Sequence, residues 1–355
     1  MIPYNKRVTI KHVAKKARVS TQTVSRVINE HPDVAPETRQ RVLEAVKQLD
    51  YRPSELARSL IQRRSKTLGV VTAGLKYIGP NRTLSGITAK AEELGYGLLL
   101  KELPSFSVND VQPTLQYLLA RQVDGILWAV QEVGNNHDWL LESPGGINIP
   151  ITFLTMEFRP GVTIFSMDNY AGGVLATQHL LDLGRRHIAH LSGPLEWWEA
   201  RQRKLSWQET LEKAGRKVKA QHSVEGNWSS ASAETAFLQL LDFYPEMDAI
   251  FVANDQMALT VLRTACKKGI RVPDDLAVVG FDNIAESSYF WPSLTTVEEN
   301  QQELGAQATR GLVSWIEAAH DGLEQMEPKA VLLQPELIIR ESTATTEKFN
   351  TVPDN

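Results

Sequence analysis

The sequence predicts a chain of two parts, a small all-α domain at the N-terminus and a larger α/β portion with parallel sheets. Three observations lead to this division. The first 66 residues carry 15 Lys+Arg against 6 Asp+Glu, whereas the rest carries 23 against 36. Apolar residues recur at helical spacing in the first fifty positions. From residue 67, short apolar runs alternate with amphipathic stretches, as in parallel sheets covered by helices on both faces.

Length and composition restrict the class of protein. At 355 residues the chain can form two or three domains with substantial cores. No apolar run approaches the roughly 18 residues that a membrane span needs, and MIPYNKRVTIKHVAKKARVS lacks the apolar segment of a secretory signal. The single cysteine, Cys266, excludes an intrachain disulfide framework and a Cys-rich zinc site. We therefore expect a cytoplasmic protein with no membrane contact, no cofactor and no metal.

The N-terminal domain, residues 1–53, is expected to hold three short helices. Thr9 can cap the first, and Ser20 can cap a second over 21–29 after a tight break at 18–20. A third helix starts at Pro36, a favourable residue for a first turn. Two short helices joined by so tight a turn form a helix-turn-helix.

The second helix of this domain leaves a polar face. Gln can pair with adenine, Arg with guanine, and Ser or Thr with phosphates or thymine methyl groups. With the excess positive charge, this face predicts contact with the major groove of double-stranded DNA. The alternative is a helical bundle with a solvated basic face. The DNA contacts expected in this domain are Thr9, Ser20, Thr21, Gln22, Thr23, Ser25, Arg26, Asn29 and Tyr51.

The pattern V-A-x-x-A-x-V-S-x-x-T-V-S-R-V-I-N, residues 13–29, resembles without a gap the head of the LacI/GalR family of bacterial repressors. The resemblance covers nearly the whole chain, through HIAHLSGP, FVANDQMAL, VVGFDN and PSLTTV. It implies a transcription regulator, a homodimer on a pseudo-palindromic operator, whose DNA affinity is controlled by a small effector, most often a sugar. It also implies a hinge helix at 54–66, where Ala57 and Leu60 contact the minor groove. The alternative is an ordinary linker whose leucines pack on the body.

Eight apolar runs after residue 66 predict strands: TLGVVTAG, GYGLLLKEL, VDGILWAV, IPITFLTM, VTIFSMD, HIAHLSGP, DAIFVAND and LAVVGFD. The series is too long for one sheet and predicts two similar lobes divided near residue 165. A late helix around 304–316 and the run AVLLQPELIIR suggest that the chain crosses back between them. The first lobe is then 67–165 plus 297–325, and the second is 166–296 plus 326–340. By resemblance, this is a sensor of the periplasmic-binding-protein-like type, residues 67–340. The tail, 341–355, has no leucine heptads, which favours a dimer.

In open α/β sheets, ligands collect beyond the carboxyl ends of the strands. Sugars need polar groups that pair with neighbouring hydroxyls and an aromatic face for the ring. The resemblance implies that Arg203, Asn254 and Asp282 form the polar clamp, with Phe165 and Trp228 as apolar walls. Two of these have alternatives: Phe165 can belong to the core, and Arg203 can lie in an exposed cationic turn.

Asp168 and Asp255 also end predicted strands, and either can instead cap the helix that follows. Asp255 is the stronger candidate for such a cap.

The first lobe departs from a sugar-responsive member of the family, because Ala73, Ala129 and Thr155 stand where that member has polar ligand contacts. Trp128 and Glu157 lie beside two of these positions. The difference, with eight tryptophans all outside the N-terminal domain, suggests a larger effector such as a di- or oligosaccharide. Secondary candidates for effector contacts are therefore Ala73, Trp128, Thr155, Glu157 and Trp197.

An enzyme acting on the same ligand is the main alternative. Asp168, Asp282 and Glu157 could flank a glycosidic bond if two of them lay about 5 to 9.5 Å apart. The sequence contains no serine elbow, phosphate-binding loop, dinucleotide-binding glycine motif or His pair at metal spacing. We therefore assign no catalytic and no metal-binding residue. A transport binding protein is disfavoured by the missing signal sequence and by the DNA-binding head.

Overall fold

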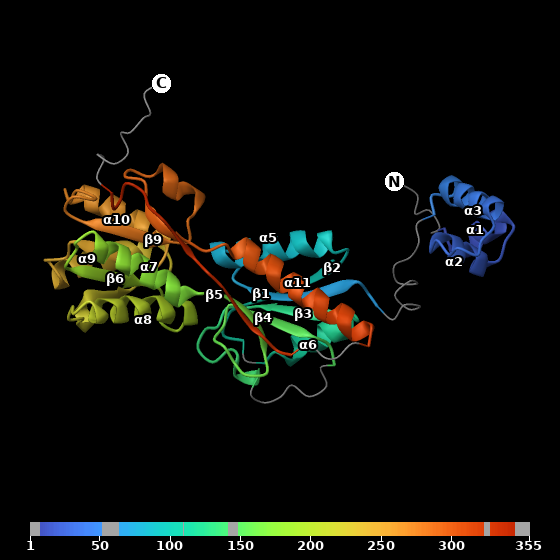
Figure 1. Cartoon of the computed structure of the whole chain (residues 1–355), viewed down its shortest axis with the longest axis horizontal. Coiled ribbons are helices and arrows are strands. Elements are labelled where there is room, and N and C mark those ends of the chain that lie inside the picture. Colours follow the sequence, from blue (N-terminus) through green and yellow to red (C-terminus); the bar gives the residue numbers. More distant parts are fainter. Residues whose placement is uncertain (1–7, 52–63, 109, 141–147, 323–326, 345–355) are drawn as a thin grey trace, which may run out of the picture. The chain divides into compact units, whose positions relative to one another are not determined.

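The computed structural model describes residues 8–51, 64–108, 110–140, 148–322 and 327–344. The chain divides into two compact units, Met1–Lys66 and Thr67–Asn355 (Figure 1). The expected hinge contacts Ala57 and Leu60 lie outside the described residues. Among the described residues, no helix is long and apolar enough to cross a membrane.

The N-terminal unit has the three helices that the sequence predicts, α1 (Ile10–Ala17), α2 (Thr21–Ile28) and α3 (Pro36–Gln48). Arg18 ends α1 in the left-handed conformation with φ of 53°. Ser20 begins α2, since its Oγ accepts the backbone N–H of Thr23 at 3.0 Å. The buried core consists of Val13, Ala14, Ala17, Val24, Val27, Val42 and Ala45.

The second unit contains two six-stranded sheets, one in each lobe. The first has the order β11-β5-β4-β3-β1-β2 and is parallel throughout. The second has the order β12-β10-β9-β8-β6-β7, in which only β12 runs antiparallel. The first-lobe strands are β1 (Thr67–Ala73), β2 (Gly97–Leu103), β3 (Gly125–Ala129), β4 (Ile151–Leu154), β5 (Thr163–Met167) and β11 (Ala330–Leu333). The second-lobe strands are β6 (Ile188–Ser192), β7 (Ser223–Glu225), β8 (Ala249–Val252), β9 (Ala277–Phe281), β10 (Thr295–Glu298) and β12 (Glu336–Ile338).

Helices cover both faces of each sheet (Figure 1). In the first lobe, α5 (Ile78–Glu93) and α11 (Gln301–His320) share one core, and α6 (Gln112–Leu119) belongs to the other. In the second lobe, α7 (Asn169–Asp182) and α8 (Trp198–Lys213) cover one face, and α9 (Ser230–Phe243) and α10 (Asp255–Lys267) the other. Three short 3-10 helices are Asp138–Leu140, Ala220–His222 and Ala285–Tyr289.

The chain crosses between the lobes three times, after β5, after β10 and between β11 and β12. The assignment of all of 326–340 to the second lobe was therefore wrong, because β11 pairs with β5 in the first sheet, with Ala330 opposite Ile164. The run AVLLQPELIIR is two strands rather than one. Pro335 lies between them and has no N–H to donate to a ladder, so the chain leaves the first sheet there and enters the second.

Helices α5 and α11 approach closely at two glycines. A Cβ on Gly86 would overlap the backbone oxygen of Gln302, and one on Gly305 would overlap the carbonyl of Thr83. Near this contact the Thr83 hydroxyl donates to Gln301 Oε1 at 3.0 Å. The packing of α5 on α11 therefore depends on glycine at both positions.

Gly86→Ala is expected to destabilise the second unit by about 1–3 kcal/mol, because the new methyl group meets backbone that must move. Gly79→Ala is the matched control in the same helix, since no atom lies within 4 Å of its added Cβ. Alanine there should leave stability unchanged or raise it. Urea unfolding measures the free energy of unfolding of both variants. Equal urea midpoints for Gly86→Ala and Gly79→Ala would contradict the close packing of α5 on α11.

Candidate functional site

The polar face predicted on α2 is open to solvent. Thr21, Gln22, Arg26 and Asn29 are exposed, and Thr23 and Ser25 are partly exposed. The opposite face carries the buried Val24 and Val27, which pack on α1 and α3. Burying the apolar face thus fixes which side chains of α2 can reach another molecule.

The other DNA-contact candidates described in the N-terminal unit, Thr9, Ser20 and Tyr51, also make contacts that stabilise its fold. The backbone N–H of Thr9 donates to Nδ1 of His12 at 3.1 Å at the start of α1. The Ser20 hydroxyl is committed to its cap. Tyr51 is half-buried against the helical core, and its N–H donates to the carbonyl of Val46 at 3.0 Å.

A cavity in the second unit receives residues from both lobes, at the carboxyl ends of the strands where ligands of such sheets collect. The second lobe contributes the loops after β6, β7, β8 and β9, and the first lobe contributes the start of α5 and the residue two after β3. Its lining residues are Tyr77, Ile78, Gly79, Pro80, Gln131, Trp197, Glu199, Arg203, Trp228, Asn254, Gln256, Asp282 and Gln301.

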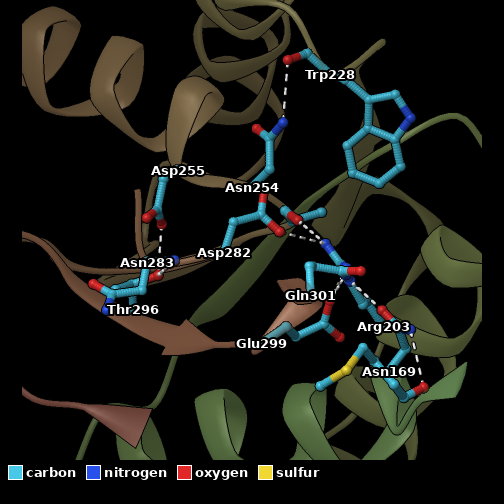
Figure 2. A network of polar contacts seen from close by, with 12 residues as sticks. Asn169, Arg203, Trp228, Asn254, Asp255, Asp282, Asn283, Thr296, Glu299 and Gln301 are labelled. Atoms are coloured by element: carbon cyan, nitrogen blue, oxygen red, sulfur yellow. Dashed lines mark hydrogen bonds and ion pairs between the residues drawn. The ribbon is translucent and has the colours of Figure 1, made fainter. Parts of the chain in front are cut away.

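Arg203 is the buried centre of the polar network (Figure 2). Its Nε donates to Asn169 Oδ1 at 2.8 Å, and Nη1 donates to the carbonyl of Ala253 at 2.6 Å. Nη2 donates to Glu299 Oε2 at 3.3 Å, and Asp282 Oδ1 lies 3.7 Å from Nη1. The guanidinium also stacks 3.6 Å from the centre of the Phe281 ring. Arg203 is therefore not an exposed cationic turn.

Asn254 connects the cavity to α10. Its Oδ1 accepts the N–H of Met257 at 2.9 Å, and its Nδ2 donates to the carbonyl of Trp228 at 3.2 Å (Figure 2). Asn254 is thus the N-cap of α10, and the expectation that Asp255 caps this helix was wrong. Asp255 is instead buried and accepts from Ser287 Oγ at 2.7 Å and Thr296 Oγ1 at 2.6 Å. Asn254 takes the cap because it is the last extended residue before the helix.

The backbone is strained at two lining residues. Trp228 has φ of 69° and Asp282 has φ of 102°, values that side chains other than glycine rarely adopt. The Asp282 loop is tied to the first lobe, since Arg82 of α5 donates to the carbonyl of Asp282 at 2.8 Å and to that of Asn283 at 3.3 Å. Such strain persists only where surrounding contacts impose it, and it concentrates at ligand sites.

Three carboxyl groups share the single guanidinium of the cavity. Burial raises the pKa of Asp282 to about 8 and those of Glu199 and Glu299 to about 7, although Arg203 opposes each shift. Asp255 raises the pKa of Asp282, Asp168 raises that of Glu299, and Arg82 lowers that of Asp282. Carboxyl groups outnumber the nearby cations, so one guanidinium does not cancel the effect of burial on their pKa values.

Glu199→Gln is expected to raise the thermal midpoint by a few degrees at pH 8 and by much less at pH 5. The folded pKa of Glu199, about 7, exceeds that of an unfolded glutamate, so folding binds a proton. Its contribution to stability is present below pH about 4.3 and is lost as pH rises toward 7. Calorimetry at both pH values checks this, and a shift of equal size at both would show that charge is not the cause.

Five residues expected near the ligand do not line the cavity. Phe165 is core, buried against Gly311 of α11. Ala73 and Trp128 lie in the core beneath α6, where the Trp128 ring is 5.0 Å from that of Trp139. The others are Thr155, which is buried, and Glu157, which is exposed with its N–H donating to Glu132 Oε2 at 2.8 Å.

The first-lobe wall is formed instead by Gln131 and the 77–80 segment, and only Trp197 among the secondary candidates lines the cavity. The sequence analysis placed this wall wrongly because it compared single positions with those of another family member. The residues at and after the ends of β3 and β4 that it selected, Trp128 and Thr155, are buried and do not line the cavity.

An aromatic cluster joins the lobes beside the cavity. The ring of Trp197 is 5.6 Å from Tyr77, 4.6 Å from Phe106 and 5.7 Å from Trp228, in each case nearly edge to face. Trp197 also makes a backbone bridge with Val133 of the first lobe. These contacts form one wall of the cavity from residues that both lobes contribute.

Sequence reasoning missed several lining residues, chiefly Tyr77, Gln131, Glu199, Gln256 and Gln301. Glu199 could have been found, because it precedes the expected ligand arginine by four positions and therefore lies on the same helix face. The others carry no local pattern.

Two protein families match the chain, each over one part. Residues 9–54 match the bacterial regulatory proteins of the lacI family, and residues 177–343 match the periplasmic binding protein-like domain. The chain is similar to the HTH-type transcriptional repressor PurR of Mannheimia succiniciproducens, with 34% identity over 94% of this chain and 98% of that protein. It is 33% identical to catabolite control protein A of Priestia megaterium over 95% and 99% of the two chains.

The lactose operon repressor of Escherichia coli is 32% identical over 84% of this chain and 82% of its own. Among solved structures, a lac repressor dimer bound to operator superposes with a TM-score of 0.84, at 30% identity over 95% of this chain and 99% of that one. A complex of the regulator CelR with cellobiose has a TM-score of 0.69, also at 30% identity, over 95% and 100%. The helix-turn-helix, the two-lobed body and these relatives agree, and the chain therefore belongs to the lacI family of bacterial regulatory proteins.

Proposed function

We propose that this protein is a repressor that binds a pseudo-palindromic operator as a homodimer and is controlled by a sugar. The observation that supports it best is the cavity around Arg203, which takes its walls from both lobes and lies in a chain with an exposed polar recognition helix. A ligand bound in this cavity contacts both lobes at once. Its binding can therefore change how the two lobes are arranged.

On DNA, α2 would enter the major groove, with Arg26 and Gln22 reading base edges and the hydroxyls near its start contacting phosphates. The excess of Lys and Arg in the first 66 residues would supply the affinity that does not depend on sequence. Ala57 and Leu60 remain proposed contacts in the minor groove.

Control would come from a shift between two arrangements of the lobes. A ligand that contacts Asp282 and Asn254 on one side and Tyr77 or Gln131 on the other favours the arrangement in which all of them meet it. Coupling of this kind is typically worth about 1–3 kcal/mol, or roughly 5- to 150-fold in operator affinity.

A disaccharide fits the surroundings of the cavity. A more open groove adjoins it and shares Tyr77, Trp197, Trp228 and Gln256 with it. The shared aromatic side chains suit the C–H face of a sugar, and hydroxyl-binding groups continue along the groove at Asn227, Ser229 and Ser230. The CelR–cellobiose complex shows that a similar regulator holds a disaccharide.

The proposed dimer has a matching surface feature. Tyr289 and Trp291 of the second lobe are 88% and 90% exposed, which is unusual for neighbouring large aromatic side chains. We propose that they lie between the two subunits. We propose further that the protein acts in the cytoplasm and is not an enzyme, since Asp168 caps α7 and Glu157 lies outside the cavity.

Tryptophan fluorescence tests the effector assignment directly, because Trp197 and Trp228 line the cavity. Titration with mono- and disaccharides should give one saturable change, and the same sugar at a hundredfold excess over its Kd should stabilise the fold by about 2.7 kcal/mol. If neutral sugars changed neither fluorescence nor thermal midpoint, the sugar assignment would be wrong.

A further inference from the structure

Several side-chain oxygens in the lining of the cavity accept no hydrogen bond from the described residues. Among the described residues, neither the Glu199 carboxylate nor that of Asp282 accepts a hydrogen bond, and the nearest cation to Asp282 is Arg203 at 3.7 Å. Gln131 Oε1 is buried and has no partner within the described part of the chain. These oxygens belong to residues that line the same cavity.

Most of the hydrogen-bonding capacity of Arg203 is used within the protein. Three of its five N–H groups donate to Asn169, Ala253 and Glu299, which leaves one N–H on each of Nη1 and Nη2, and its face is stacked on Phe281. One amide hydrogen of Asn254 goes to the carbonyl of Trp228. The indole Nε1 of Trp228 is buried without a partner among the described residues, and the side-chain amides of Gln131 and Gln256 are further donors in the lining.

The negative charge around the cavity also disfavours an anionic ligand. Glu199 lies in the first turn of α8, where the positive end of the helix favours an anion, and its own carboxylate already occupies that position. Glu199, Asp282 and Glu299 face Arg203 from three different elements. A phosphate or carboxylate would bring only acceptors and further negative charge among them.

We infer that the effector is a non-anionic polyhydroxyl compound whose hydroxyl or amine groups donate to Glu199 and Asp282, and that Glu199 excludes phosphorylated and acidic sugars. The inference rests on the proposed function, because it assumes that the effector occupies this cavity. It adds a specificity residue, Glu199, and narrows the expected sugars to those without an anionic group.

The test uses the full chain and matched sets of probes. Glucose, galactose, cellobiose and lactose are each offered with their phosphorylated and aldonic acid forms, and glucosamine is added, in one mixture. Retained compounds are identified by mass spectrometry after gel filtration, and each is then titrated by calorimetry. The Asp282→Asn variant, treated identically, defines retention that depends on the cavity.

Retention of only uncharged or amine-bearing probes is the expected result. Glu199→Gln should weaken that binding roughly tenfold, since a neutral amide oxygen replaces a charged acceptor. It should also reduce the ratio between the affinity for a neutral sugar and the affinity for its anionic form. Glu196→Gln is the control, because this exposed side chain lies three residues earlier and does not line the cavity. Its affinity should equal that of the wild type.

Two results would overturn the inference in distinguishable ways. A phosphorylated or acidic probe that binds the wild type more tightly than its neutral parent contradicts the exclusion and leaves the regulator function standing. If no probe shows retention that is lost in Asp282→Asn, the assignment of a sugar effector to this cavity falls together with the inference, and operator binding is still tested separately by anisotropy.

Discussion

Arg26→Ala is expected to abolish the preference of the protein for its operator while leaving both units folded. Arg26 is exposed on α2, and its side chain makes no hydrogen bond or ion pair with the described residues. A bidentate arginine–guanine pair is worth about 1–3 kcal/mol, and a dimer on a palindrome loses two of them, or about 2–6 kcal/mol.

Fluorescence anisotropy with operator and scrambled duplexes measures this loss as a ratio of affinities. Arg41→Ala is the control, because it removes one exposed positive charge from α3 of the same unit. It should weaken binding to both duplexes alike and reduce the salt dependence. An Arg26→Ala protein that still distinguished the two duplexes would show that α2 does not read the operator through this residue.

Asp282→Ala is expected to leave operator binding intact and to remove the response to the effector. A hydrogen bond from an uncharged sugar hydroxyl to this carboxylate is worth about 1.5–3 kcal/mol, so its loss is expected to weaken effector binding roughly ten- to 150-fold. Arg203 would keep its bonds to Asn169 and Glu299, so the fold around it should survive. Because Asp282 has φ of 102°, Asp282→Asn is the companion variant that changes the charge and keeps the shape.

The control for this position is Asp274→Ala, which removes an exposed carboxylate of the second lobe whose ion-pair partner, Arg271, is also exposed. Calorimetric titration with the sugar identified by fluorescence should give an unchanged Kd for this control. An effector response of normal size in both Asp282 variants would contradict the assignment of the polar clamp.

Much of the architecture could be predicted because periodicity and capping act locally. Burial of Val24 and Val27 and the cap at Ser20 fix α2 from a few neighbouring residues. The eight apolar runs became strands. Seven of them are buried in parallel sheets and form continuous apolar sequence, and the eighth, β2, is a partly exposed edge strand. The sheet to which β11 belongs could not be predicted from the sequence. An edge strand joins a sheet through partners far away in the chain, such as Ile164 for Ala330.

The second-lobe side of the candidate site was predicted well, because its residues follow strands or lie in the helix after β6. Arg203, Asn254, Asp282 and Trp228 all line the cavity, but whether they bind an effector stays a prediction. The first-lobe wall could not be predicted, because Gln131 and Tyr77 reach the cavity through the way the lobes meet and through no local motif.

The most direct test of the account is anisotropy of the full-length protein on a palindromic operator, repeated in the presence of each mono- and disaccharide. The account predicts operator-selective binding that a single uncharged sugar changes several-fold to about a hundredfold, with that response absent in Asp282→Asn. Binding that ignored sequence would contradict the repressor function. Selective binding that was indifferent to every sugar, or was altered equally in Asp282→Asn, would contradict control through this cavity.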